Sequence, residues 1–397
     1  MNKRIAVLLV TLLVTFAAIA QNQQRPGRAR ISCGPYVQNV TETGFSVVWE
    51  SDIDAMAWVE LAPDDGSHFY NMSRPKYYDL RAYGRHHIGR THKVRVEGLE
   101  PGVKYRYRVM MKGAYLPGSG SEYEFADPSG SDVYGREPYK VKTLSKEYET
   151  IRFDVYNDVH DKDSLLSVLM SGARKNLDFV VLNGDMTSNI SSISKVPERY
   201  LKTVSAALKG SIPLVLSRGN HEMRGKDSPL LMDYIDTPTG MPYYAFKMGK
   251  FFFIALDGCE DKPDDDIEYR GRTVTEPYLA KEAEWLKEVI NSKECKEAEV
   301  KVVFCHMPPE KNGWKGPANL CKYFVPILNE AGVDIMLSGH LHEHKLYRPE
   351  ENVSGAIFPV VSNPNVQRME VTLTEKSLSL KIFAPDGKQT NAANFVF

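Results

Sequence analysis

Residues 179–185 read Phe-Val-Val-Leu-Asn-Gly-Asp, an apolar run that ends on a glycine and a carboxylate. Runs of this length are typical of strands that are buried on both faces of a sheet. Four further runs end on polar side chains in a similar way, and they span 151–157, 212–217, 300–305 and 334–338. Because open α/β sheets gather ligands at the carboxyl ends of their strands, we expect the polar residues after these runs to lie along one sheet edge.

Helical patterns separate several of these runs, for example at 164–173, 197–208 and 280–290. Strands that alternate with helices predict an α/β domain, which we place at residues 149–397. Four more strands are predicted, in a hairpin at 243–246 and 251–256 and in a closing antiparallel pair at 368–374 and 377–384.

The first part of the chain has a different pattern of apolar and polar residues. From about residue 30 to 143, short stretches alternate apolar and polar residues and are separated by glycine, proline and aspartate, as at 44–49 and 104–109. Alternation with a period of two predicts half-buried strands. We therefore expect an all-β sandwich domain at residues 28–148.

The bulk composition is that of an ordinary globular protein. The chain has 397 residues, 42% of them hydrophobic, with 50 basic against 51 acidic side chains. A length of this kind favours two domains. Since the charges nearly cancel, no overall field favours a nucleic-acid polymer or an anionic membrane surface as partner, and a small-molecule substrate is expected.

The N-terminus reads as a secretory signal peptide over residues 1–20. Two basic residues precede an apolar stretch of roughly 13 residues, which is shorter than the ~20 that a membrane span needs. The small residues Ala18-Ile-Ala20 then suggest cleavage before Gln21. We expect a secreted or periplasmic protein without stable membrane insertion. Its five cysteines are an odd number, so at least one is unpaired within the chain, and Cys305 is expected to be a buried free thiol.

The polar segments after the five runs contain the ligand types of transition metals. They are Asp158-Val-His160, Gly184-Asp185, Gly219-Asn-His-Glu222, His306 and Gly339-His-Leu-His342. Carboxylate, amide and imidazole groups together select transition metals over a thiolate-bound zinc. Any one segment is weak evidence, whereas all five in one chain are strong evidence for a metal site.

In the order DxH, GD, GNHE, H and GHxH, these segments resemble the calcineurin-like metallophosphoesterases, over about residues 150–397. The resemblance implies a layered αββα fold with two mixed sheets flanked by helices, two divalent metal ions, and a bridging hydroxide as nucleophile. It assigns Asp158, His160 and His342 to one ion, Asn220, His306 and His340 to the second, and Asp185 to both. The N-terminal part, with Trp49 and the turn Leu99-Glu-Pro-Gly102, resembles the fibronectin type III-like domain of purple acid phosphatases.

Two positions depart from the purple acid phosphatases. Where those enzymes have a tyrosine three residues after the bridging aspartate, this chain has Ser188, and where they have glycine in the first motif it has His160. Without the phenolate, manganese, iron and zinc are comparable candidates, and we expect a colourless protein.

Three further residues beside the ligands are candidates for catalysis or substrate binding. By the same resemblance His221 would serve the leaving group, either as a proton donor or by stabilising charge, and Asn220 and Arg218 would contact phosphate. Arg224 could act like Arg218. The alternatives are a structural role for His221 and solvated or ion-paired roles for both arginines. Glu222 is expected to orient His221 or a neighbouring backbone group.

The sequence thus predicts a secreted phosphomonoesterase for small phosphorylated metabolites or nucleotides. A phosphodiesterase with the same metals is the alternative, and a catalytically decayed binding or adhesion protein is a third. Two irregular stretches, 113–137 and 259–275, are candidates for shaping the substrate pocket. The substrate, the ester class, the metals and the oligomeric state stay open.

Overall fold

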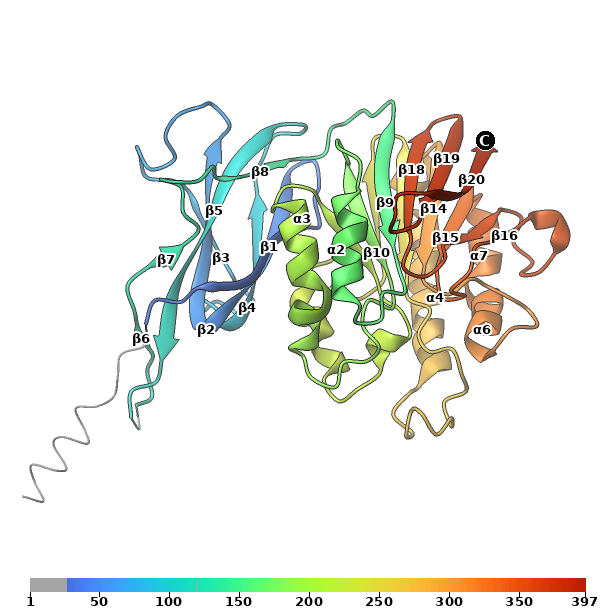
Figure 1. The fold of residues 1–397 in the computed structure, drawn as a ribbon, viewed down its shortest axis with the longest axis horizontal. Coiled ribbons are helices and arrows are strands. Elements are labelled where there is room, and N and C mark those ends of the chain that lie inside the picture. Colours follow the sequence, from blue (N-terminus) through green and yellow to red (C-terminus); the bar gives the residue numbers. More distant parts are fainter. Residues whose placement is uncertain (1–26, 119) are drawn as a thin grey trace, which may run out of the picture.

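The computed structural model describes residues 27–118 and 120–397 (Figure 1). The predicted signal peptide, residues 1–20, lies outside the described residues. Up to residue 142 the described chain forms one eight-stranded sheet. Its strands are β1 (Ile31–Gln38), β2 (Gly44–Pro63), β3 (Lys76–Tyr78), β4 (Ile88–Glu97), β5 (Lys104–Tyr115), β6 (Glu124–Phe125), β7 (Ser129–Gly130) and β8 (Tyr139–Lys142).

Strand β2 organises this sheet. A strand has only two edges, yet β2 pairs with four neighbours because its two halves have different partners. The first half pairs with β1 and β4, and the second half with β3 and β5. The register against β4 shifts between Glu50 and Ala55, where the partners change. Trp49 is buried just before this point. The fibronectin type III-like identity of this part and the domain boundary near residue 148 stay predictions.

The rest of the chain forms two mixed sheets of six strands each. In the first, the parallel strands β9 (Ile151–Tyr156), β10 (Phe179–Asn183) and β11 (Leu214–Ser217) are followed across the sheet by antiparallel β18 (Arg368–Thr374), β19 (Ser377–Phe383) and β20 (Gln389–Val396). In the second, parallel β13 (Phe251–Leu256), β14 (Val300–Cys305), β15 (Ile335–Ser338) and β17 (Val360–Ser362) are edged by antiparallel β12 (Tyr244–Met248) and β16 (Lys345–Tyr347).

Aromatic side chains join the two sheets face to face. Phe153 and Phe179 of the first sheet stack with ring centroids 4.7 Å apart, and Phe253 of the second sheet lies edge-on to both rings. Phe304 stacks on Phe253 at 6.0 Å. All four side chains are buried. Burying a side chain of this size is worth about 1.5–3 kcal/mol, so the aromatic cluster is a main reason why the sheets stay together.

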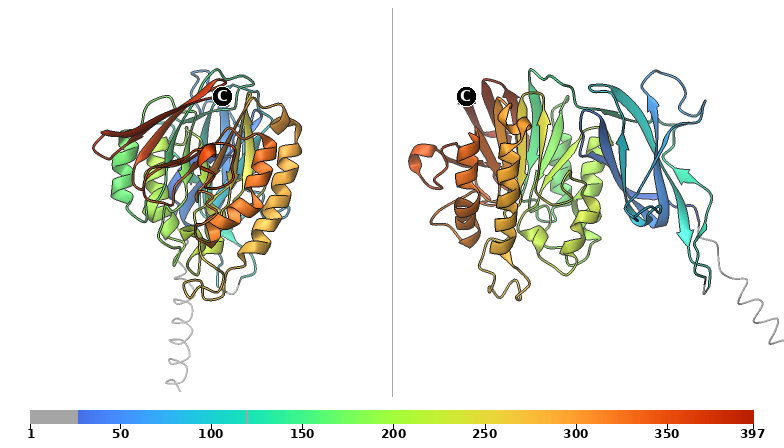
Figure 2. Two further views of the ribbon diagram at one scale, coloured as in Figure 1. Left: turned by 90° about the vertical axis from the view of Figure 1, so that its right-hand side faces the viewer. Right: turned by 180° about the vertical axis from the view of Figure 1, so that it is seen from behind.

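Helices cover the two outer faces, as Figure 1 and Figure 2 show. The first sheet packs against α2 (Asp163–Ser171), the π-helical turn η1 (Pro197–Leu201) and α3 (Lys202–Leu208). The second packs against α4 (Thr275–Asn291), α5 (Lys293–Lys296), α6 (Lys315–Tyr323) and α7 (Val325–Ala331). The order of layers is α, β, β, α, as the resemblance implied. The remaining helical elements are the 3₁₀ helices η2 (His221–Met223), η3 (Ser228–Tyr234) and η4 (Pro349–Glu351).

One expectation about this fold was wrong. The five ligand-bearing runs do not end along one sheet edge, because β9, β10 and β11 belong to the first sheet while β14 and β15 belong to the second. A strand that is buried on both faces shows the same apolar run in either sheet. The runs therefore located the strands but could not assign them to a sheet.

The N-terminal sheet packs against the α/β part at α3, at β11 and at the segment that follows the GNHE residues. The hydroxyl of Tyr36 donates to the carbonyl of Tyr234 at 2.7 Å, and Lys93 Nζ donates to the carbonyls of Met232 and Ile235 at 3.0 Å. Among the described residues, no helix is both long and apolar enough to cross a membrane. All five cysteines are free thiols, and Cys305 is buried as expected.

Candidate metal centre

The polar residues after the five strands converge where the two sheets meet. Their ligand atoms form three overlapping groups, and within each group the atoms lie within 4.8 Å of one another. The groups are Asp158, His160 and His342; His160, Asp185 and His221; and Asp185, His306 and His340. Six of the seven predicted metal ligands thus lie in one cluster.

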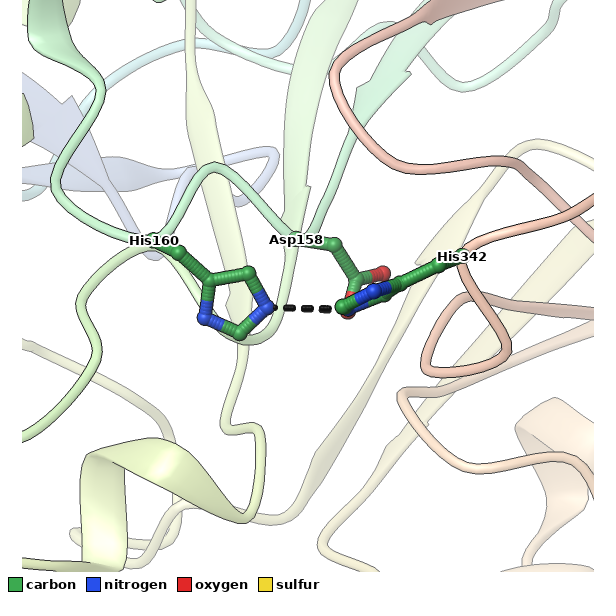
Figure 3. Close-up of side chains that lie close together, drawn as sticks. All are labelled: Asp158, His160 and His342. Carbon is green, nitrogen blue, oxygen red and sulfur yellow. Dashed lines mark hydrogen bonds and ion pairs between the residues drawn. The ribbon is translucent and has the colours of Figure 1, made fainter.

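The first group is drawn in Figure 3. His342 Nε2 lies 3.2 Å from Asp158 Oδ1 and 3.0 Å from His160 Nε2, and His160 Nε2 lies 3.7 Å from the same carboxylate oxygen. Two nitrogens and one oxygen face a common point in this view. Ligand atoms of one transition-metal ion, at about 2.0–2.2 Å from the metal, have a similar mutual spacing.

In the group of Asp185, His306 and His340, the first two side chains are buried. His306 Nδ1 donates to the carbonyl of Asn183 at 2.8 Å, so Nε2 is the free nitrogen of the ring, and it lies 3.1 Å from Asp185 Oδ2. The side-chain oxygen and nitrogen of Asn220 have no hydrogen-bond partner among the described residues, although Asn220 is buried. The same holds for Asp158 Oδ1 and His306 Nε2.

These unpartnered atoms fit a cation. A buried polar group without a partner costs about 1–3 kcal/mol, and here several such groups with lone pairs gather at one place. Asp185 is a member of two groups, which is the position that a carboxylate shared by two ions needs. The residues therefore suit a pair of divalent metal ions, although their roles as ligands stay predictions.

The charges of the site also call for a cation. Burial alone would lower the pKa of His306, but the carboxylates of Asp185 and Asp158 raise it to about 10. Burial would raise the pKa of Asp158, but His306 and the hydrogen bonds of its neighbours hold it well below the usual range. Partial burial and the charge of His306 lower the pKa of the half-buried His340 to about 4. Two buried carboxylates thus draw a positive charge to this point, as a proton or as a metal.

An unusual backbone conformation aims the ligands. Five of the seven predicted ligands have positive φ, namely Asp158 (52°), His160 (48°), Asp185 (54°), His340 (68°) and His342 (58°). Residues other than glycine rarely adopt this left-handed backbone conformation, and each instance costs on the order of 1–3 kcal/mol. Hydrogen bonds between the segments hold the strained turns in place. The backbone N–H groups of Asp158, His160 and Gly339 donate to the carbonyls of Gly184, Asp185 and His306 at 3.1, 3.0 and 2.8 Å.

Two glycines permit the close approach of the segments. A Cβ on Gly219 would lie 2.2 Å from Asp185 Oδ1, and one on Gly339 would lie 2.7 Å from Asp158 Oδ2. Real Cβ atoms essentially never come so close to another atom. Glycine at these positions therefore lets the predicted ligands meet.

Glu222 supports the site through the backbone. Its carboxylate is buried and accepts the N–H groups of Asp185 at 2.8 Å, Thr187 at 3.1 Å and Gly219 at 3.0 Å. Of the two roles that the sequence suggested, orienting neighbouring backbone is the one seen. Burial and the nearby Asp185 raise the pKa of Glu222 to about 7.

Sequence reasoning missed a pair of supporting asparagines. The amide of Asn157 donates to Asp158 Oδ2 at 2.5 Å and to the carbonyl of Asn363 at 3.0 Å, while the Asn363 amide donates back to Asn157 Oδ1 at 2.5 Å. Asn157 directly follows β9 and Asn363 directly follows β17, and this position at a strand end was the available sequence signal.

His221 lies at the open side of the cluster, with 28% of its side chain exposed. Its Nδ1 donates to the carbonyl of Ser188 at 2.8 Å, and its Nε2 lies 3.8 Å from Asp185 Oδ2 and 3.2 Å from Arg224 Nη1. Burial lowers the pKa of His221. The Nε2 atom therefore faces the site, where Arg224 Nη1 is its neighbour.

Both arginines are ion-paired. Arg218 pairs with Asp257, which also accepts the hydroxyl of Tyr278 at 2.6 Å, and these contacts raise the pKa of Arg218 further. Arg224 contacts three carboxylates, at 3.3 Å to Glu260, 3.0 Å to Asp261 and 2.7 Å to Glu268. These contacts match the ion-pair alternative, and phosphate binding by either arginine stays a prediction.

The two candidate pocket loops differ in position. Part of 259–275 lines a cavity of about 440 Å³ together with Arg218 and Arg224, beside the cluster. The other stretch, 113–137, carries β6 and β7, which lie on the side of the N-terminal sheet that is remote from the α/β part (Figure 1), so it does not shape the pocket. A larger cavity of about 810 Å³ lies between the N-terminal sheet and the edge strands β11 and β12, away from the cluster.

Comparisons with known proteins agree with this geometry. A family model described as "Calcineurin-like phosphoesterase" matches residues 151–344. Purple acid phosphatase 21 of Arabidopsis thaliana is 21% identical over 303 residues, which are 70% of this chain and 60% of that protein. The match thus spans less than two thirds of that relative. The structure of PhoD resembles the fold with a TM-score of 0.61 at 13% identity, and covers 92% of this chain and 89% of PhoD.

Proposed function

Because residues 151–344 form a calcineurin-like phosphoesterase domain, which is a hydrolase domain for phosphoester bonds, we propose that this protein is a dinuclear metal-dependent phosphomonoesterase. Its substrates would be small phosphorylated metabolites or nucleotides. The observation that carries the proposal is the position of Asp185, which is shared by two groups of candidate ligands.

Metal binding, phosphoryl contact and protonation of the leaving group can each be assigned to residues of the site. Two divalent ions, when bound by the seven residues, supply an activated water and neutralise phosphoryl charge. Asn220, buried with no other partner among the described residues, can serve as a ligand or meet a phosphoryl oxygen. Ser188 holds His221 through Nδ1–H, so Nε2 faces the site; when both ring nitrogens are protonated, Nε2–H can give a proton to the leaving oxygen or stabilise charge there. The phosphoryl group would pass directly to water.

A monoester is favoured over a diester by its charge. A phosphomonoester dianion carries one more negative charge than a diester, so it gains more from two divalent cations held beside Asp158 and Asp185. Arg224 adds little to this preference, because it is already paired with Glu260, Asp261 and Glu268. A phosphodiesterase with the same metals is the alternative. A decayed binding protein is less well supported, since all seven predicted ligands are present in the sequence and six of them lie in one cluster.

The test is a pair of aryl phosphates on metal-reconstituted protein. The wild type should hydrolyse p-nitrophenyl phosphate faster than bis(p-nitrophenyl) phosphate, and Asp185→Asn should lose both the metals and the activity. The reverse preference would establish the diesterase. Metal-replete protein that cleaves neither ester would reject both and favour the binding protein.

Export and metal identity complete the proposal. Residues 1–20 would direct secretion and be removed before Gln21, which N-terminal sequencing of the extracellular or periplasmic protein would check. Ser188 occupies the position of the phenolate that colours purple acid phosphatases, so the loaded protein would be colourless with manganese, iron or zinc. A visible charge-transfer band in the pure protein would contradict this part.

A further inference from the structure

An exposed indole lies beside the metal centre. Trp314 is 60% exposed, and its ring centroid is 6.4 Å from that of His340 at an interplanar angle of 81°. It ends the loop that leads from His306 to α6, so it sits at the same end of the sheets as the predicted ligands. Large aromatic side chains are usually mostly buried, and one that stays exposed beside a reaction site is available to a ligand.

A chain of contacts connects Trp314 with the other side of the site. Lys262 Nζ lies 6.0 Å from the centroid of the Trp314 ring, and Lys262 is ion-paired with Glu268. Glu268 also accepts from Arg224 at 2.7 Å, and Arg224 lies 3.2 Å from His221. We call Arg224, Glu268, Lys262 and Trp314 the rim. It runs from His221, the residue beside the leaving oxygen, to His340.

The charges of the rim are already paired. Arg224 is shared by Glu260, Asp261 and Glu268, and Lys262 is held by Glu268. A second phosphate group would have to compete with these carboxylates for either cation. The indole of Trp314 is uncharged, so no ion pair occupies it; among the described residues its ring is approached by Lys262 Nζ at 6.0 Å and lies edge-on to the His340 ring. The rim therefore suits an uncharged planar group better than a further anion.

We propose that Trp314 stacks the base of a nucleoside monophosphate while its phosphate occupies the metal centre. This inference rests on the proposed phosphomonoesterase function and names the substrate class of that site. The leaving group of such a substrate is the nucleoside, which must depart on the side of His221 and pass the rim. Stacking on an aromatic side chain accepts any base, because every base has a π-face, so we expect little preference among the four bases.

Matched substrates test the proposal. A nucleoside 5′-monophosphate and ribose 5-phosphate differ only in the base, so the ratio of their kcat/KM values measures base recognition. We expect the wild type to prefer the nucleotide by about 5- to 160-fold, which corresponds to a stacking energy of about 1–3 kcal/mol per base. Trp314→Leu should bring the ratio close to one, while Trp314→Phe should keep part of the preference. Tyr83→Leu, at a fully exposed aromatic residue of the N-terminal half, is the control and should keep the wild-type ratio.

The outcomes separate the two proposals. If metal-replete wild type hydrolyses neither substrate, the phosphomonoesterase function itself is lost. If it hydrolyses both with equal kcat/KM, or if Trp314→Leu lowers both equally, the function stands and base stacking is overturned. Phenyl phosphate tests whether Trp314 contacts a base or an aryl group bonded directly to the phosphate. If Trp314→Leu lowers kcat/KM for phenyl phosphate but not for the nucleotide, the substrate class is an aryl phosphate and not a nucleotide.

Discussion

His306 Nε2 lies 3.1 Å from Asp185 Oδ2, although the two residues follow strands of different sheets. Asp185 comes after β10 in the first sheet, and His306 comes after β14 in the second. The candidate metal centre is therefore assembled by the packing of one sheet on the other. The aromatic cluster of Phe153, Phe179 and Phe253, which joins the sheets, also sets the distance between these two ligands.

Glycine at position 219 is expected to be essential for this assembly. In Gly219→Ala the new methyl group would lie 2.2 Å from Asp185 Oδ1, so the shared carboxylate or the whole segment must move. A displacement of about 1 Å at a reacting centre can cost 10²-fold in rate. We expect Gly219→Ala to lose phosphatase activity by about that factor and to bind less metal by elemental analysis. Gly27→Ala, where nothing lies within 4 Å, is the matched control. Full metal content and activity in Gly219→Ala would contradict the position of Asp185.

Glu222 is expected to act through the backbone of Asp185. In Glu222→Gln one acceptor oxygen is replaced by an amide NH₂, which cannot accept the N–H groups that the carboxylate now binds. Residues that hold ligands in place are typically worth 10–100-fold in metal affinity or activity. We expect a loss in this range for metal affinity, measured by titration of the apoprotein. Glu284→Gln, at an exposed glutamate of α4, should bind metal like the wild type. An unchanged affinity in Glu222→Gln would show that the three hydrogen bonds do not position the site.

Metal removal is expected to destabilise the protein. Asp158 and Asp185 are both buried, and their mutual repulsion is relieved only by a positive charge in the site. A ligand that binds only the folded state at 100 times its Kd stabilises that state by about 2.7 kcal/mol. We therefore expect a chelator to lower the Tm by several degrees and added manganese or zinc to restore it, as measured by differential scanning calorimetry. In Asp185→Asn the added metal should have little effect, and an equal rise of Tm in that variant would place the ions elsewhere.

The sequence predicted the strands well and their arrangement less well. The strands β13 and β14 were predicted with the bounds they have because mainly apolar runs mark buried strands directly, and β18 because its apolar and polar residues alternate. The distribution of the strands over two sheets was not predictable, since it depends on which faces pack together and not on any local pattern. The alternation of apolar and polar residues in the N-terminal half likewise predicted strands, but it did not predict that β2 pairs with four neighbouring strands.

The sequence likewise predicted some features of the candidate site and missed others. Ligand types and their order were readable because the chemistry depends on residue identity. The carboxylate partners of Arg224 come from a loop more than thirty residues further along the chain, and no spacing rule connects the two. The left-handed turns at Asp158 and His340 were equally hidden, since neither residue is a glycine and only the neighbouring segments hold them in that conformation.

His221 should affect the chemical step and not metal binding. Its Nε2 faces the site while Nδ1 is fixed by Ser188, so His221→Ala removes a proton donor without removing one of the seven predicted ligands. General acids contribute typically 10²–10⁴-fold. We expect a loss of this size in kcat for a poor leaving group such as an alkyl phosphate, and a much smaller loss for p-nitrophenyl phosphate, whose phenolate leaves without a proton. His344→Ala, at a histidine whose Nδ1 lies 3.2 Å from the Ser362 carbonyl, is the control. Equal losses for both leaving groups, with the metals retained, would show that His221 stabilises charge and does not donate a proton. Loss of the metals would show that His221 is a ligand. Its position in the group with His160 and Asp185 is compatible with that role.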